Sequence, residues 1–212
     1  MPVITLEEGF FPAWCEVKTA RLFSLKPDQE KSFPDNQEKE MFLVCQGQIL
    51  VETVPAAARL TEGNSFFLNT PGTGQVKVKS IAGFSLFLHL TGDWSYLSGA
   101  GIFTVRNGKP PADDSPYQYW KTTTFDNHYH DCNCYWFVLN GRCQVVTEGK
   151  FYQVKPGDCV ITGRGWHHDI VSLIYDESAT LAWVTGPLEG KKRPGHLWEG
   201  THGKAEPVKE RT

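Results

Sequence analysis

The stretch that decides the fold is His128-Tyr129-His130-Asp131-Cys132-Asn133-Cys134-Tyr135-Trp136-Phe137-Val138-Leu139-Asn140-Gly141. Residues 135–139 are an unbroken run of aromatic and aliphatic side chains just ahead of a glycine, which is typical of a β-strand followed by a turn. Before that run, His128 and His130 stand two residues apart, and side chains at this spacing point to the same face of a strand. Both imidazoles can therefore enter one cavity.

A second histidine cluster follows in Gly163-Arg164-Gly165-Trp166-His167-His168, which leads into the mostly apolar residues 169–174. The two glycines predict a tight loop, and the apolar residues predict a strand. Imidazole binds Zn, Cu, Fe and Ni, and an ion held by His128 and His130 needs further donors from elsewhere in the chain. This loop is the obvious source of a third ligand.

The composition predicts an all-β protein. The 212 residues include 20 glycines and 13 prolines, which separate short runs rich in β-branched and aromatic residues. These runs are Met41–Cys45, Ser65–Leu68, Phe84–Leu90, Tyr135–Leu139 and Leu181–Thr185. The best helix candidate, Thr53–Leu60, is short and contains Pro55.

The two halves of the sequence share one register. Phe42–Gly47 aligns with Trp136–Gly141 at an offset of 94 residues, and Gly63 aligns with Gly157 at the same offset. One ungapped register over this distance favours a duplication. We therefore expect a first domain over residues 1–95, a connecting segment over 96–117, a second domain over 118–186 and a C-terminal extension over 187–212.

These motifs resemble those of the cupin superfamily, over most of the C-terminal half. The first cupin motif is His-x-His, three or four residues, Glu, six residues and Gly, and its places are taken by His128, His130, Cys134 and Gly141. The second is Gly, five residues, Pro-x-Gly, two residues and His, and its places are taken by Gly157, Gly163, Gly165 and His168. Cys134 thus replaces the Glu of the pattern, and Gly163 replaces the Pro.

The resemblance implies two fused cupin barrels, which are double-stranded β-helices, with a metal ion in the second. It assigns His128, His130 and His168 as ligands, and it leaves His167 outside the motif. It does not imply one reaction, because cupins include dioxygenases, decarboxylases, isomerases, epimerases and non-catalytic binding proteins. We expect one divalent transition metal per chain, with Fe, Zn, Cu, Ni and Mn all open.

Cys134 leaves two alternatives. As a thiolate it completes a shell of three histidines and one cysteine, which favours softer ions such as Zn, Cu or Fe over Mn or Mg. As a neutral thiol facing the cavity it leaves a three-histidine site with positions open to water, substrate or dioxygen. Cys132 falls in a turn between two strands and is expected outside the shell.

The first half departs further from the cupin pattern. At the 94-residue offset, the four candidate metal ligands map onto Pro34, Asn36, Glu40 and Gly74. No imidazole remains at these positions, and a single carboxylate does not make a transition-metal site. We therefore expect a structural barrel there, or a wall of the interface in a homodimer.

Four further residues near the motifs are candidates for contact with a substrate. Trp136 and Trp166 can form a substrate wall or belong to the core, and Arg164 can hold a substrate carboxylate or stay solvated in its loop. His167, or a histidine of the extension, is the candidate for proton transfer. The extension, which includes the His- and Trp-rich segment 195–203, either folds back over a barrel or is a disordered end with incidental histidines.

The bulk properties exclude several classes of partner. The net charge of −3 arises from 21 basic and 24 acidic residues without long runs, so a nucleic-acid partner is not expected. Met1–Phe10 has two acids and no basic residue, unlike a signal peptide, and no apolar run approaches the roughly 20 residues that span a bilayer. We expect a cytoplasmic protein with reduced thiols and no membrane partner.

Two functions fit these observations. The first is a metal-dependent enzyme that acts on a small polar metabolite, with an oxygenase-type reaction favoured by the resemblance and an isomerase as the alternative. The second is a binding or sensor protein in which the metal orients a ligand without turnover.

Overall fold

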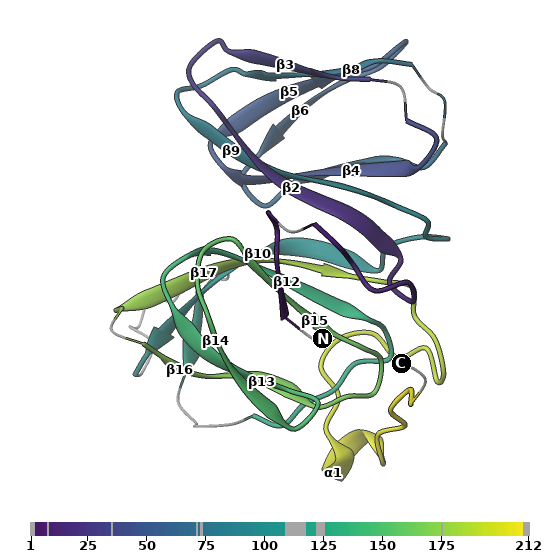
Figure 1. Ribbon diagram of the computed structural model, residues 1–212, viewed down its shortest axis with the longest axis vertical. Coiled ribbons are helices and arrows are strands. Elements are labelled where there is room, and N and C mark those ends of the chain that lie inside the picture. Colours follow the sequence, from purple (N-terminus) through teal and green to yellow (C-terminus); the bar gives the residue numbers. More distant parts are fainter. Residues whose placement is uncertain are drawn as a thin grey trace. The chain divides into compact units, whose positions relative to one another are not determined.

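The structure is a computed structural model that describes residues 3–7, 9–34, 36–70, 72, 74–108, 118–121, 126–174 and 176–209. The described part of the chain contains seventeen strands and one short helix, α1 (Glu199–His202), so the fold is all-β (Figure 1). None of its helices is long and apolar enough to cross a membrane. The six cysteines are buried and form no disulfide.

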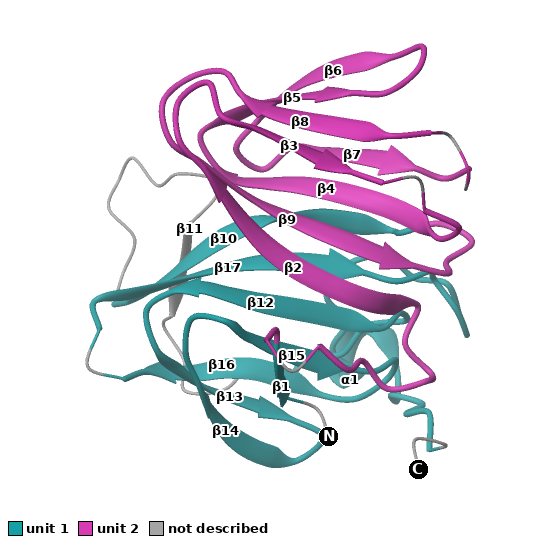
Figure 2. Ribbon diagram, turned by 45° about the horizontal axis from the view of Figure 1, so that its top comes forward, with its two compact units in different colours: residues 1–5, 97–212 teal, residues 6–96 magenta. Residues whose placement is uncertain are grey.

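The chain divides into two compact units, coloured separately in Figure 2. Unit 2 comprises Leu6–Tyr96, and unit 1 comprises Met1–Thr5 together with Leu97–Thr212. Each unit contains two β-sheets and its own apolar core, which agrees with the expected pair of all-β cupin barrels. The two units are described separately below.

Unit 2 contains two four-stranded antiparallel sheets. One has the order β2 (Val17–Leu25), β9 (Ser85–Gly92), β4 (Lys39–Gln46) and β7 (Ser65–Leu68). The other has the order β3 (Glu30–Phe33), β8 (Val76–Ser80), β5 (Gln48–Glu52) and β6 (Ala57–Thr61). The core draws residues from both sheets, and includes Phe42 and Phe87 from the first and Val51 and Val78 from the second.

Unit 1 contains a six-stranded and a three-stranded sheet. The larger has the order β1 (Val3–Thr5), β15 (Asp158–Thr162), β12 (Cys134–Asn140), β17 (Ser178–Thr185), β10 (Gly99–Asn107) and β11 (Gln118–Lys121). The smaller has the order β14 (Lys150–Val154), β13 (Cys143–Thr147) and β16 (His168–Leu173). All pairs are antiparallel except β10 with β11.

Strand pairing repeats at the offset found in the sequence. Glu40 of β4 pairs with Leu68 and Thr91, and Cys134 of β12 pairs with Thr162 and Thr185, so each position is displaced by 94 residues. Two turn glycines repeat as well. Gly47 and Gly141 have φ values of 78° and 73°, and a Cβ at either would collide with a backbone oxygen, that of Phe84 or of Ser178. These turns require glycine because the backbone has a positive φ and because there is no space for a Cβ.

Two domain boundaries and one expected helix differ from the sequence-based expectation. Residues 99–107, placed in the connecting segment, form β10, which pairs with β17 over eight positions and completes the sheet of unit 1. Val3–Thr5 pairs with β15 and so belongs to unit 1, not to the domain that follows it in sequence. The helix candidate Thr53–Leu60 instead enters strand β6, because residues 57–61 pair with β5.

The C-terminal extension folds back onto unit 1. Tyr129 and Leu197 exchange two backbone hydrogen bonds of 2.9 and 3.0 Å, and both side chains are buried in one small cluster with Ala205. Arg193 donates to both carboxylate oxygens of Asp131. The described part of the extension, residues 187–209, therefore belongs to unit 1 and packs directly against the first histidine motif.

Candidate metal centre

His128, His130 and His168 come together in unit 1, as their motifs predict. His128 lies just before β12 and forms an isolated β-bridge with His168, whose N–H donates to the His128 carbonyl at 3.0 Å. One side-chain nitrogen from each of the three residues lies within 4.8 Å of the others. All three are buried, with exposed fractions of 4%, 9% and 1%.

The three imidazoles fit the requirements of a transition-metal site. The Nε2 atoms of His130 and His168 are buried without a hydrogen-bond partner in the part of the chain that the structure describes. Leaving a buried polar atom unsatisfied costs about 1–3 kcal/mol, so such atoms need a partner that side chains do not provide here. Metal coordination through Nε2 would satisfy them, and imidazole is a ligand for most first-row transition metals.

Burial favours the neutral, metal-coordinating form of two of these imidazoles, those of His130 and His168. It lowers the pKa of His168 to about 4, and it lowers the pKa of His130 well below the usual value, with the neighbouring His168 and His196 acting in the same direction. The Nδ1 atoms of His168 and His128, which are the ring nitrogens other than Nε2, also have polar partners. The Nδ1 of His168 lies 3.1 Å from the Trp166 carbonyl, and that of His128 lies 3.2 Å from a carboxylate oxygen of Asp126. Such contacts orient the rings of metal ligands.

Cys134 lies beside His130, on the side of the ring that faces away from its unsatisfied nitrogen. Its sulfur is 2.6 Å from the Nδ1 of His130. Among the described residues, the distances group Cys134 with His130 and Cys132, and not with the three histidines. Cys132, which is expected outside the ligand shell, lines the cavity. When Nε2 of His130 is a metal ligand, Nδ1 carries the proton, and the sulfur that replaces the cupin Glu accepts its hydrogen bond.

Two residues of the three-histidine cluster, His128 and His130, line a cavity of about 400 Å³ within unit 1. Its apolar lining includes Phe103, Trp136, Ile170, Trp183 and Leu188. Its polar lining includes His128, His130, Asp126, Asp169 and His196. The volume is in the range of sites for small molecules, and the mixture of many apolar and few polar groups is typical of them.

His196 is a cavity residue that motif comparison does not identify. Its ring stacks on His128 at 4.2 Å and on His130 at 5.0 Å between centroids. A side-chain nitrogen or oxygen from each of Asp126, His128 and His196 also lies within 4.8 Å of the others. Burial lowers the pKa of His196, against the opposing effect of Asp126 and Asp169. The sequence signal was the concentration of His and Trp in residues 195–203.

Of the four residues expected to contact a substrate or transfer protons, only Trp136 lines the cavity. His167 has its Nε2 3.8 Å from Glu199 and its ring against Tyr129. His168 is the first residue of β16 and belongs to the histidine cluster, whereas His167 precedes the strand and contacts Tyr129 and Glu199. Arg164 pairs with Glu189 at 3.5 Å, and the Trp166 indole donates to the Val208 carbonyl at 3.0 Å. These three residues hold the C-terminal extension instead.

Comparison with known proteins supports this assignment of the fold and motifs. The family model described as Cupin domain (Cupin_2) matches residues 117–185. The chain is 37% identical over 203 residues to the uncharacterized protein y4oW of Sinorhizobium fredii, and the alignment covers 94% of this chain and 92% of that protein. The match to the family model contains both histidine motifs.

Solved structures with the same fold have low sequence identity. Bacillus subtilis oxalate decarboxylase, whose structure was studied for its Mn(II) centres, matches with a TM-score of 0.61 and 10% identity over 92% of this chain and 74% of that one. AerE from Microcystis aeruginosa matches with a TM-score of 0.56 and 10% identity over 79% and 86%. The protein PA5104 from Pseudomonas aeruginosa matches with a TM-score of 0.53 and 15% identity over 78% and 79%.

Proposed function

The chain belongs to the cupin superfamily, in one family with the Sinorhizobium fredii protein, and on this premise we propose that it is a metal-dependent enzyme acting on a small polar metabolite. The observation that carries the proposal is the convergence of three buried imidazoles, two of which, His128 and His130, line one cavity. A fold alone does not specify a reaction, so the argument rests on the site.

His128, His130 and His168 are the residues that would hold the ion. When bound, a divalent transition metal supplies a Lewis acid or a centre for reaction with dioxygen. Three protein ligands are typical of catalytic sites, because they leave coordination positions for a substrate. The manganese centres of the oxalate decarboxylase with a similar fold support a metal in this position, without identifying which metal this chain selects.

The other cavity residues bind and orient the metabolite. Trp136, Trp183 and Phe103 form an apolar wall that excludes water from one side of the cavity. On the polar side, Asp126 and Asp169 offer carboxylates, and His196 offers an imidazole carried by the extension. A largely apolar cavity beside three imidazoles favours an oxygenase-type reaction, because dioxygen is apolar and the donor set accepts Fe or Cu.

The test measures metal content and oxygen consumption on one preparation. The protein purified without added chelator is expected to hold close to one transition-metal ion per chain by elemental analysis. The double change His128→Ala with His130→Ala should abolish loading, whereas His202→Ala should retain it, because that imidazole accepts a hydrogen bond from Trp198 at 3.1 Å and does not line the cavity.

Oxygen uptake with a panel of small organic acids then separates the reaction classes. Uptake that depends on the loaded metal supports the oxygenase. A loaded protein that converts a substrate without oxygen uptake is an isomerase or lyase, and one that binds a ligand without turnover is a sensor. Full metal loading after the double histidine change would refute the site itself.

A further inference from the structure

Unit 2 contains a second cavity, of about 590 Å³, that the metal site does not use. Its residues come from β2, β3, β4, β9 and the segment between β3 and β4. Alignment of the two halves of the chain shows that this unit has no histidine at the positions of the cupin motifs. His89, however, lies outside the motifs on β9 and contributes an imidazole to the cavity.

His89 is fixed in one orientation by three neighbours. Its Nε2 lies 2.6 Å from a carboxylate oxygen of Glu40, and both side chains are buried. Its ring stacks on Phe42 at 4.6 Å between centroids and contacts Phe33 at 4.5 Å. Since Glu40 occupies Nε2, the nitrogen left for a ligand is Nδ1, which makes no hydrogen bond with a residue that the structure describes.

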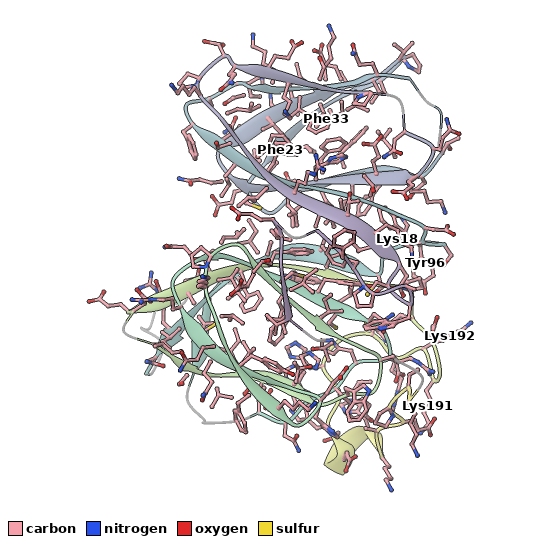
Figure 3. All side chains as sticks on the ribbon, in the orientation of Figure 1. Lys18, Phe23, Phe33, Tyr96, Lys191 and Lys192 are labelled. Atoms are coloured by element: carbon pink, nitrogen blue, oxygen red, sulfur yellow. The ribbon has the colours of Figure 1, made fainter. Side chains whose placement is uncertain are left out.

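Two cations lie in the same cavity without acidic partners. Arg21 is directly opposite His89 in the β2–β9 ladder, so both side chains are on the same face of the sheet. Lys31 of β3 has its ammonium 4.7 Å from the centre of the Phe23 ring. Figure 3 labels Phe23 and Phe33 near one another in this unit. Neither cation forms an ion pair with a described residue.

The two acids of the cavity, in contrast, already have donors. Glu40 accepts from His89, and Glu38 accepts a hydrogen bond from the Thr91 hydroxyl. Beside these two acids, the cavity groups without a hydrogen-bond or ion-pair partner among the described residues include a guanidinium, an ammonium and one imidazole nitrogen, next to the faces of two phenylalanines. This combination suits an anion with an apolar body, because charge-assisted hydrogen bonds hold the anion and aromatic rings pack against the rest.

We propose that the cavity of unit 2 binds a small carboxylate with an apolar body, through Arg21, Lys31 and His89, without a metal ion. The Arg21 guanidinium donates to the carboxylate, Lys31 adds a second charge, and Phe23 and Phe33 contact the apolar part. The site is independent of the histidine cluster in unit 1, since it shares no residue with it.

The test uses benzoate as a probe on the full-length protein, with benzamide as its uncharged counterpart, and measures affinity by isothermal titration calorimetry. Arg21→Gln removes the charge from the cavity, and Arg59→Gln removes the same charge from the exposed face of β6 in the same unit. Because a hydrogen bond to a charged group contributes about 1.5–3 kcal/mol, Arg21→Gln should weaken benzoate binding roughly 10- to 100-fold.

Arg59→Gln and the double change His128→Ala with His130→Ala should both leave benzoate affinity unchanged, and benzamide should bind much more weakly than benzoate. Lys31→Gln removes the second charge of the same site and should also weaken benzoate binding. Absence of saturable benzoate binding, equal affinity for benzamide, or an unchanged affinity in both cavity variants would overturn the proposal. Loss of binding only in the double histidine variant would also overturn it, by placing the benzoate in unit 1.

Discussion

In unit 2, His89 of β9 pairs with Arg21 on one neighbouring strand and with Phe42 on the other. The corresponding residue of unit 1 is Trp183 of β17, which pairs with Gly101 and Trp136. Two positions further along the strands, on the same face, the first sheet has Thr19, Thr91 and Glu40, and the second has Gly99, Thr185 and Cys134. The same three strands therefore present a polar and charged face in one unit and an apolar face in the other.

The glycines of unit 1 account for much of this difference. A Cβ at Gly99 or at Gly101 would lie 2.8 Å from the Trp183 ring, so the indole covers the strand that bears them. Unit 2 has Thr19 and Arg21 there, and their side chains reach the cavity. Unit 1 thus takes its polar groups from the histidine motifs and the extension, and unit 2 takes them from the sheet. Two copies of one fold can in this way carry unlike sites.

The largest expected difference between the two units follows from removing the metal. At a free metal concentration about 1,000 times the dissociation constant, binding adds about 4 kcal/mol to stability. Chelation should therefore reduce amide protection in β12, β13 and β16 of unit 1, as measured by hydrogen exchange, and leave β4, β5 and β8 of unit 2 unchanged. Equal losses in both units would show that the site does not belong to unit 1 alone.

Substitutions of the turn glycines test whether the two units depend on the same crowded turn. Gly47→Ala and Gly141→Ala should each cost about 3 kcal/mol, since both positions combine a positive φ with a backbone collision. Gly63→Ala and Gly157→Ala are matched controls, also at positive φ but in open space, and should cost about 1 kcal/mol. Urea denaturation measures all four. Equal costs at the four positions would contradict the argument from crowding.

The His89–Glu40 pair tests the polar face of unit 2. His89→Phe leaves the buried Glu40 carboxylate without its donor and should destabilise the protein by about 2–3 kcal/mol. The double change with Glu40→Leu should cost less than the two single changes combined, because it removes the acid that the first change isolates. A double-mutant cycle in denaturant measures the coupling. Additive costs would mean that the pair is not coupled.

The smallest expected effect concerns position 134, where unit 1 has Cys134 and unit 2 has Glu40. Cys134→Glu gives unit 1 the acid that unit 2 keeps as Glu40, and it should raise the affinity for Mn relative to Zn about tenfold, or about 1.4 kcal/mol. Competitive metal titration measures the ratio. Cys134→Ser keeps the size without adding a carboxylate and should leave the preference in place; the same ratio in both variants would exclude this position from metal selection.

The sequence indicated the strands and the three histidines, because their patterns depend on spacing within short segments. It also indicated the 94-residue offset, because two such segments repeat along the chain. It did not indicate what depends on distant pairing. His89 meets Glu40 across 49 residues, and only strand order brings them together. His196 reaches the cavity because the extension pairs with Tyr129, which no periodicity in the extension reveals. Arg164 and Trp166 likewise have partners in that extension, which local spacing does not reveal.

The pairing of β1 with β15 joins the beginning of the chain to a strand that is completed late in synthesis. Val3 meets Val160, so a ribosome releases all of unit 2 before the first strand finds its partner. Until then Val3–Thr5 has no strand beside it, and afterwards it covers the outer edge of β15. Expressing residues 97–212 alone would leave that edge bare, and a bare edge strand invites pairing between molecules.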